Sequence, residues 1–380
     1  MICLNKRIIG IILSAAFISL TVIFGCKKDD NQSNSTSLSV RKNVKELSAQ
    51  EKADFVNAIK LLKATRSPYD TNLNYYDQFV FWHYKAFYCN SGMGMSGMFP
   101  AHQNPAFLPW HRSYLDLFEK ALRKVSGKPI CVPYWDWTDP ASTAAVFADD
   151  MFGGNGDPSQ GYEVTTGPFR RGEWTIRISD DTNIDSLIQL GIIGTNPHPN
   201  LMRAFGVFRN ATVELPTAQE VQFCLGVNTY DSYPWDASVD TNASFRNSLE
   251  GWRGCAGNDC QNSQMDVIAI PGLRRSVMHN VVHIYVGGVF PDNGSFRPGS
   301  MTQNTSPNDP VFWIHHANID RLWSAWMARH QSAYLPVSGG PIGSNLYDVM
   351  EPFSLRTDGF NTPYSVLNEN KMGYKYDRLP

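Results

Sequence analysis

Long runs of like charge are absent from this 380-residue sequence. Its 33 basic and 35 acidic side chains leave a formal net charge of −2, which offers no basic surface for the phosphates of a nucleic acid. Charged residues make up 18% of the chain, below the roughly 25% typical of soluble domains. The composition therefore argues against nucleic-acid binding and favours small neutral ligands.

Internal repeats and a second change of composition are also absent, so the chain shows no division into several domains. Hydrophobic residues at 42% and aromatic residues at 12% supply enough apolar surface for a large core. Residues 26–44 are rich in Asn, Ser and Thr and predict a flexible tether. Residues 45–380 are accordingly expected to form one domain.

A long hydrophobic run lies at the N-terminus. Two basic residues precede an apolar stretch from Ile8 to Gly25, which is the pattern of an export signal over residues 1–25. Residues 23–26 resemble the lipobox of bacterial lipoproteins, in which the cysteine becomes the lipid-bearing first residue. We therefore expect an exported lipoprotein, periplasmic or at the cell surface, whose membrane contact is a lipid anchor at Cys26. The alternative is that the run is a membrane-anchoring helix; both place the domain outside the cytoplasm.

The cysteines show no metal-binding pattern. After Cys26 there are five, an odd number, so at least one thiol stays unpaired in a compartment where disulfides persist. Cys255 and Cys260 flank a turn-rich tetrapeptide and are the pair that spacing favours for a local disulfide. The sequence leaves the other connectivities open, and we assign none of the cysteines to metal.

Four segments have helical character, and each carries at least one histidine. They span residues 75–88, about 109–127, part of the interval 271–287, and 309–329. Between the second and third, a stretch rich in Gly, Pro, Asn and Asp predicts loops with short strands. We therefore expect a mainly α fold, with an antiparallel four-helix core surrounded by long loops and a few short strands.

Six of the nine histidines lie in or just before these helices and form two groups of three. They are His83, His102 and His111, followed by His279, His283 and His316. The pair at 279 and 283 is one i, i+4 step apart, which points both imidazoles the same way. With no cysteine, carboxylate or HExxH pattern, such groups suit copper, zinc, iron or nickel, and spacing does not choose among these metals. His198 and His330 are interpreted as structural.

Two longer motifs resemble the copper-binding signatures of the tyrosinase family. The first is His102–Arg112, which contains Phe-Leu-Pro-Trp-His-Arg; the second is Asp309–Arg321, which contains Asp-Pro-Val-Phe-Trp-Ile-His-His-Ala-Asn-Ile-Asp-Arg. Further similarity takes in Pro133–Trp137, Phe245–Trp252 and Met350–Asp377, so it covers nearly everything after the tether. The chain most resembles the short bacterial tyrosinases, which are type 3 dicopper proteins.

This resemblance implies that each group of three histidines holds one copper ion, so that the cofactors are two copper ions. Adjacent helical residues diverge by about 100°, so we expect only one of His315 and His316 to face the metals. The family pattern selects His316, with His315 packed or hydrogen-bonded behind it. The implied partners are O2 and small phenols. In the family a glutamate and an asparagine are thought to hold a water that deprotonates phenols, and Glu250 and Asn280 resemble them.

The implied activity is ortho-hydroxylation of monophenols together with oxidation of o-diphenols to o-quinones. The alternatives are a catechol oxidase without monophenolase activity, a haemocyanin-like oxygen carrier and a dinuclear zinc hydrolase. A catechol oxidase would differ from a tyrosinase in the base that deprotonates the phenol. An oxygen carrier would have a closed entrance to the copper site, and a zinc hydrolase would usually have carboxylates that bridge its metal ions. The sequence favours a tyrosinase first, then a catechol oxidase, an oxygen carrier and a zinc hydrolase.

Several positions depart from the family pattern. The segment between Gly254 and His279 is longer than in short bacterial tyrosinases and can displace Glu250. Pro100 stands where some members carry a cysteine that crosslinks to the second histidine, so no such thioether is expected. Gln303 is expected to leave the site entrance open. The sequence ends soon after the last motif, so we expect no covering C-terminal domain and leave room for a copper-delivery partner.

Overall fold

The computed structural model describes residues 38–88, 101–181, 193–251, 278–330 and 333–380. All of these residues belong to one compact unit, Leu38–Pro380. The predicted signal peptide, the tether before residue 38, Pro100 and the proposed cysteine pair at 255 and 260 lie outside the described residues. None of the described helices combines the length and apolar character needed to cross a bilayer.

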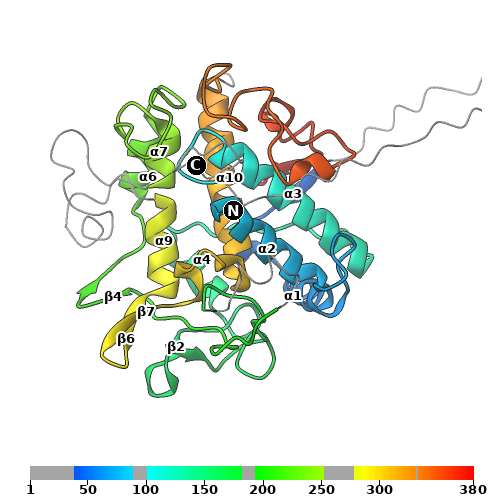
Figure 1. Ribbon diagram of the computed structural model, residues 1–380, viewed down its shortest axis with the longest axis vertical. Coiled ribbons are helices and arrows are strands. Elements are labelled where there is room, and N and C mark those ends of the chain that lie inside the picture. The colour runs from blue at the N-terminus through cyan, green and yellow to red at the C-terminus, as the bar shows by residue number, and fades with distance from the viewer. Residues whose placement is uncertain (1–37, 89–100, 182–192, 252–277, 331–332) are drawn as a thin grey trace, which may run out of the picture. The chain divides into compact units, whose positions relative to one another are not determined.

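Helices dominate the described residues, as predicted (Figure 1). The α-helices are α1 (Ala49–Ala64), α2 (Tyr75–Tyr88), α3 (Phe107–Ser126), α4 (Pro140–Val146), α6 (Ala218–Leu225), α7 (Phe245–Glu250), α9 (Met278–Gly287) and α10 (Val311–His330). The strands are β1 (Ser39–Arg41), β2 (Gly156–Asp157), β3 (Glu163–Val164), β4 (Val207–Phe208), β5 (Ala211–Thr212), β6 (Val289–Asp292), β7 (Ser295–Pro298) and β8 (Tyr374–Tyr376). Short 3-10 turns join several of them.

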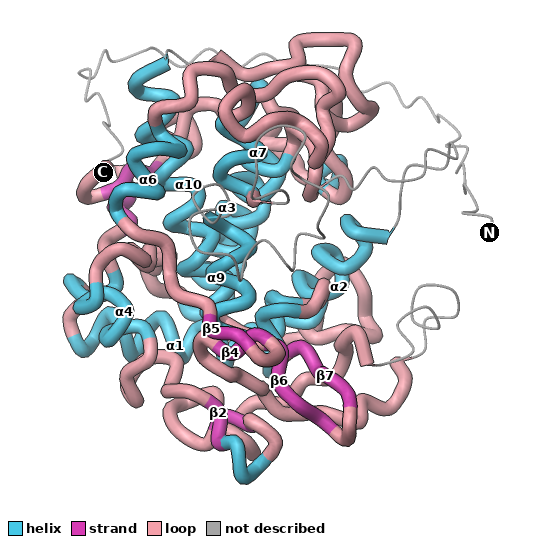
Figure 2. Tube along the Cα trace, turned by 90° about the vertical axis from the view of Figure 1, so that its left-hand side faces the viewer, coloured by secondary structure: helices cyan, strands magenta, loops and turns pink. Residues whose placement is uncertain are grey.

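The strands form small sheets among loops. β1 pairs with β8 in parallel, β2 pairs with β3, and a third sheet has the order β5-β4-β6-β7. Both Figure 1 and Figure 2 place the third sheet at one end of α9, from which β6 follows directly. The mainly helical class with few short strands is confirmed, whereas an antiparallel set of four core helices stays a prediction.

The predicted helix ends have clear local causes. α2 spans the predicted residues 75–88. α3 ends where Gly127 adopts the left-handed region at φ 66°, which glycine tolerates at no steric cost. α10 begins after Asp309, whose carboxylate Oδ1 accepts from the amide of Val311 at 3.1 Å, so the predicted N-cap is present.

Helix α1 was not predicted. Ser48 caps it, since its hydroxyl accepts from the amide of Glu51 and the Glu51 carboxylate accepts from the amide of Ser48. Phe55, Ile59 and Leu62 are buried along one face, and the helix packs against both α2 and α3. α1 therefore supports two of the helices that carry histidines.

The predicted tether, residues 26–44, includes residues that the structure places in a strand. Residues 39–41 form β1, whose register pairs Ser39 with Tyr374 and Arg41 with Tyr376. Arg41 is fully buried, which no flexible linker residue is. The segment 39–44 therefore belongs to the folded unit, because its backbone is paired with a strand from the far end of the sequence.

A buried ion-pair network ties α3 to α10. Arg112 of α3 donates from Nε to Oδ1 of Asp320 on α10 at 2.5 Å. Tyr374 and Tyr376 of β8 donate to Oδ2 of the same carboxylate at 2.7 and 2.5 Å, and Arg41 donates to it at 3.2 Å. Because all of these side chains are buried, the network holds both helices and the β1–β8 pair in one arrangement.

Candidate metal centre

The first histidine cluster joins three separate segments. His83 lies on α2, His102 precedes α3, and His111 lies on the first turns of α3. Their ligand atoms lie within 4.8 Å of one another, and the three side chains are 1–2% exposed. The ring centroids of His83 and His102 are 5.0 Å apart, and those of His102 and His111 are 4.9 Å apart. The structure thus brings together the first predicted trio.

The second cluster has four members instead of the predicted three. His279 and His283 come from α9, while His315 and His316 both come from α10. Their ligand atoms also lie within 4.8 Å of one another. The Nε2 atoms of the α9 pair approach to 3.0 Å, as the i, i+4 spacing predicted. His315 was expected to pack behind His316, yet its ring nitrogen is part of the cluster.

The two clusters adjoin. The ring of His111 in the first cluster stacks on that of His316 in the second, with centroids 4.2 Å apart and an interplanar angle of 12°. His102 and His279 lie 6.0 Å apart across the same boundary. Phe107 contacts both sides, at 4.9 Å from His111 and 4.9 Å from His279. Two metal ions held by these clusters would therefore be neighbours.

Backbone carbonyls orient four of the rings. The Nδ1 atom of His83 hydrogen-bonds the carbonyl of Asn304 at 2.8 Å, and that of His283 the carbonyl of Met301 at 2.7 Å. His111 uses the carbonyl of Phe107, one turn earlier on α3, at 2.8 Å. His279 uses the carbonyl of Glu250 at 3.3 Å. A carbonyl only accepts, so Nδ1 carries the proton and Nε2 keeps the lone pair that a metal needs.

Burial keeps the clustered imidazoles neutral. Removal from water lowers the pKa of every histidine in both clusters below the ordinary 6.5, and neighbouring imidazoles add to the effect at most positions. The pKa falls to about 3 for His83 and to about 4 for His283. Neutral imidazole is the metal-binding form, so the protein offers these ligands ready for use at neutral pH.

The donor set fits metal ions that prefer nitrogen ligands. Among the described residues, Nε2 of His111 and both ring nitrogens of His316 are buried without a hydrogen-bond partner. Such an atom costs about 1–3 kcal/mol in a protein interior unless something else satisfies it. The Nε2 atoms of His279 and His283 are 3.0 Å apart. If each bound the same ion at about 2.0–2.1 Å, the angle between the two bonds would be about 95°, which is an ordinary angle between metal ligands.

Glu250 and Asn280 lie beside the second cluster. Glu250 ends α7, is fully buried, and its carbonyl contacts His279 as described above. Its carboxylate accepts from the amide of Gln103 at 2.6 Å and from Arg246 at 3.1 Å. Asn280 donates to the carbonyl of Gly251 at 3.0 Å. The long segment after residue 251 therefore does not remove Glu250 from the cluster.

Three further positions that the sequence singled out are His198, His330 and Gln303. His198 is partly buried in a loop, and His330 ends α10 with its ring stacked on Trp326 at 4.5 Å, so neither belongs to a cluster. Gln303 is only 9% exposed, and its amide bonds the carbonyl of Pro298 and the hydroxyl of Thr305. Its amide is thus engaged within the protein.

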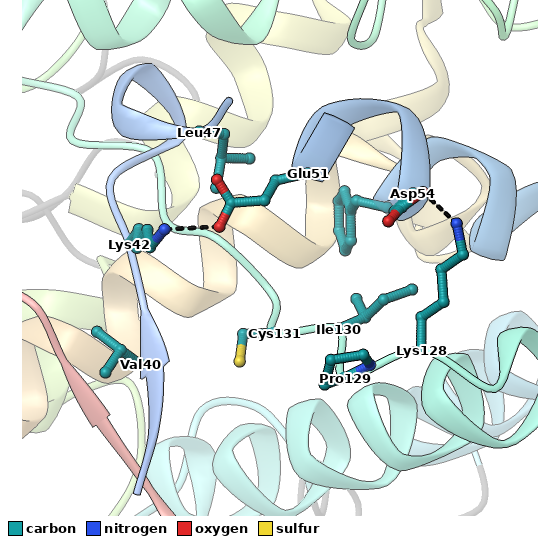
Figure 3. A pocket seen from close by; sticks show the side chains of 10 residues that line it. Val40, Lys42, Leu47, Glu51, Asp54, Lys128, Pro129, Ile130 and Cys131 are labelled. Carbon is teal, nitrogen blue, oxygen red and sulfur yellow. Dashed lines mark hydrogen bonds and ion pairs between the residues drawn. The ribbon is translucent and has the colours of Figure 1, made fainter. Parts of the chain in front are cut away.

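A separate pocket lies away from the histidines. It has a volume of about 200 Å³ between β1, the start of α1 and the segment after α3. Figure 3 shows Cys131 among its lining side chains and two ion pairs, Lys42 with Glu51 at 2.6 Å and Lys128 with Asp54 at 2.5 Å. It contains no histidine, so it is not the metal site.

The mainly helical fold and the two adjoining all-imidazole clusters define a protein with a dinuclear metal centre held by histidines. The family model described as the common central domain of tyrosinase matches residues 73–329, and the chain belongs to the tyrosinase family. A tyrosinase of Streptomyces lincolnensis is 37% identical over 320 residues, which cover 83% of this chain and 93% of that protein. A tyrosinase of Streptomyces antibioticus is 36% identical over 344 residues, which cover 90% of this chain and 100% of that protein.

Solved structures agree on the fold. A variant of polyphenol oxidase from Thermothelomyces thermophila superposes with a TM-score of 0.56 at 22% identity, covering 90% of this chain and 89% of that one. The prediction of family and cofactor is therefore confirmed: the chain is a copper-dependent oxidoreductase of the tyrosinase and polyphenol oxidase type, with a two-copper centre, and it oxidises phenols with O2.

Proposed function

We propose that this enzyme both hydroxylates monophenols at the ortho position and oxidises o-diphenols to o-quinones. The copper pair supplies O2 binding and the exchange of two electrons. We assign one copper ion to His83, His102 and His111, and the other to His279, His283 and His316. The stacking of His111 on His316 at 4.2 Å supports this assignment, because a two-copper centre would need the two groups of ligands to adjoin.

The hydroxylase part of the proposal depends on a base. A phenol with a pKa near 10 has to lose its proton before its oxygen binds a metal. We propose that Glu250 and Asn280 hold a water that takes this proton. Support comes from the buried carboxylate of Glu250, whose backbone contacts His279, and from Asn280, which directly follows that histidine and is 8% exposed.

Glu250 forms a buried ion pair with Arg246. The two side chains are one helical turn apart on α7, fully buried, and 3.1 Å apart. Because Arg246 and the backbone amide of Gln103 engage both oxygens of the Glu250 carboxylate, it is less free to hold a water, and this favours a catechol oxidase as the second candidate. The other two alternatives gain no support, since the clusters contain no carboxylate and the reported sequence relatives are tyrosinases.

The decisive experiment compares monophenol and diphenol turnover in the copper-loaded protein. The wild type is expected to oxidise both tyrosine and L-DOPA to absorbing quinones. Glu250→Gln keeps the shape of the side chain and removes the base, so monophenol turnover should fall about 100-fold or more while diphenol turnover changes far less. Asp231→Asn is the matched control, because Asp231 pairs with the same Arg246 at 2.8 Å without contacting the clusters.

The possible outcomes separate the candidates. If the wild type oxidises only the diphenol, the enzyme is a catechol oxidase. If Glu250→Gln leaves the ratio of monophenol to diphenol turnover unchanged, Glu250 is not the base. Absence of both activities at full copper content would contradict the proposed function.

We also propose that the enzyme is an exported lipoprotein anchored through Cys26, as the N-terminal sequence predicts. Cys26→Ala should then release the protein into the soluble fraction, whereas a membrane-anchoring helix would keep it bound. A copper-delivery partner is a further proposal, supported by the burial of the proposed ligands, all of which except His283 are at most 2% exposed. Full activity after loading the purified copper-free protein with free copper would show that no such partner is required.

A further inference from the structure

Asp180 is a partly buried carboxylate that belongs to neither histidine cluster. It accepts four hydrogen bonds from two consecutive residues between β7 and α10. The backbone amide of Asn304 donates to it at 2.8 Å, and that of Thr305 at 3.0 Å. The side-chain amide of Asn304 also donates, at 3.0 Å, and so does the hydroxyl of Thr305, at 2.9 Å. Four donors thus converge on the two oxygens of one side chain.

One peptide group connects Asp180 to the first cluster. The N–H of Thr305 and the carbonyl of Asn304 belong to the same planar trans peptide group, so they point in opposite directions. On one side the N–H donates to the carboxylate of Asp180. On the other side the carbonyl accepts from Nδ1 of His83 at 2.8 Å. A carboxylate that fixes the N–H therefore also fixes the direction of the carbonyl that orients the ring.

Two other oriented rings have supports of their own. His283 bonds the carbonyl of Met301, which lies in a separate 3-10 turn, Ser300–Thr302. His111 bonds a carbonyl of its own helix, α3. The four donors to Asp180 all lie beyond that turn and outside α3. The influence of Asp180 on ring orientation is therefore expected at His83 and not at the other two histidines.

We propose that Asp180 is a positioning residue of the first copper site and acts through this peptide group on His83. The proposal rests on the assignment of His83 as a copper ligand. A carboxylate suits the position because every partner donates, and its two oxygens offer about four acceptor sites. An amide would replace one oxygen by an NH2 group that only donates, so one of the two backbone N–H groups would lose its acceptor.

The test follows each ring separately in the full-length protein, labelled for NMR in its histidine nitrogens. The Nδ1–H signals of His83, His111 and His283 are assigned by their loss in variants with Gln at each position. In the copper-free protein, Asp180→Asn and Asp180→Ala should shift the His83 signal and speed the exchange of its proton with water. The signals of His111 and His283 should stay in place.

Zn²⁺ titrations in competition with a chelator, followed by the same signals, measure the affinity of each cluster. The partners that orient a metal-binding histidine are typically worth 10–100-fold in metal affinity. We therefore expect both Asp180 variants to weaken the first cluster by about 10–100-fold and to leave the second unchanged. Asp181→Asn is the matched control, because this neighbouring carboxylate pairs with Arg297 of β7 at 3.0 Å, and it should reproduce the wild type.

An unchanged His83 signal in both Asp180 variants would overturn the proposal. Equal shifts of all three histidine signals together with a lower melting temperature would also overturn it, because they indicate a general loosening of the fold. If His83→Gln weakens Zn²⁺ binding and the Asp180 variants do not, the proposal fails and the copper ligands stand. None of these measurements requires turnover, so they remain distinct from failure of the proposed function.

Discussion

Mild acid should unfold the metal-free protein, because its two clusters contain six buried imidazoles and one half-buried imidazole whose pKa values are all lowered. His83 provides the magnitude, since it is 1% exposed and its pKa falls to about 3. Its folded pKa lies below the unfolded value of about 6.5, so the unfolded state binds more protons between the two values and stability falls there as pH is lowered. Above about pH 6.5 the group contributes nothing.

The loss is large on the scale of domain stability. Between about pH 7.5 and about pH 5, His83 alone lowers the free energy of unfolding by about 2 kcal/mol, at 1.36 kcal/mol per unit of pKa shift. The other buried members, whose pKa values are also lowered, act in the same direction. Because a domain has only about 5–15 kcal/mol in total, the metal-free protein should unfold before about pH 5.

The assay is urea denaturation followed by tryptophan fluorescence at several pH values in the presence of a chelator. His83→Gln keeps an amide that can donate to the carbonyl of Asn304 but cannot be protonated, so it should recover about 2 kcal/mol at about pH 5 relative to its own stability at neutral pH. His198→Gln, in a partly buried loop outside the clusters, is the control and should match the wild type. A metal-free protein equally stable across this range would refute the reasoning.

Two further predictions concern residues that support the clusters. Asp320→Asn removes the charge shared by two buried arginines, so the free energy of unfolding should fall by about 3–5 kcal/mol, and an unchanged melting temperature would contradict this. Gly287→Ala would place a Cβ 2.3 Å from Oγ1 and 2.6 Å from N of Thr302, in the turn that orients His283. Metal affinity of the second cluster should drop in a titration, whereas Gly154→Ala, with its nearest atom at 3.6 Å, should not change it.

Local signals in the sequence predicted much of the fold. α2 and α10 followed from hydrophobic periodicity and from Asp309 as an N-cap, because these features act over a few residues. α1 was missed although Ser48 and Glu51 form a capping box that sequence reading can detect. The pairing of β1 with β8 was out of reach, because its hydrogen bonds join opposite ends of the chain and no local pattern announces them.

The histidine clusters also combine features that local sequence signals predict with features that only the folded chain shows. The i, i+4 spacing of His279 and His283 and the two long motifs predicted which histidines come together. Helical geometry argued that His315 would turn away from His316, but both rings lie in the second cluster, with centroids 5.0 Å apart. The carbonyls that orient the rings, such as those of Asn304 and Met301, carry no side-chain signal and appear only once the chain is folded.

The pairing of β1 with β8 has a consequence for biosynthesis. Asp320, one helical turn beyond His316, is held by tyrosines of β8, which follow it by 54 and 56 residues in the sequence. A nascent chain still on the ribosome therefore lacks the strand that locks α10 in register. The placement of His316 on α10 therefore depends on a strand that is synthesised more than fifty residues later.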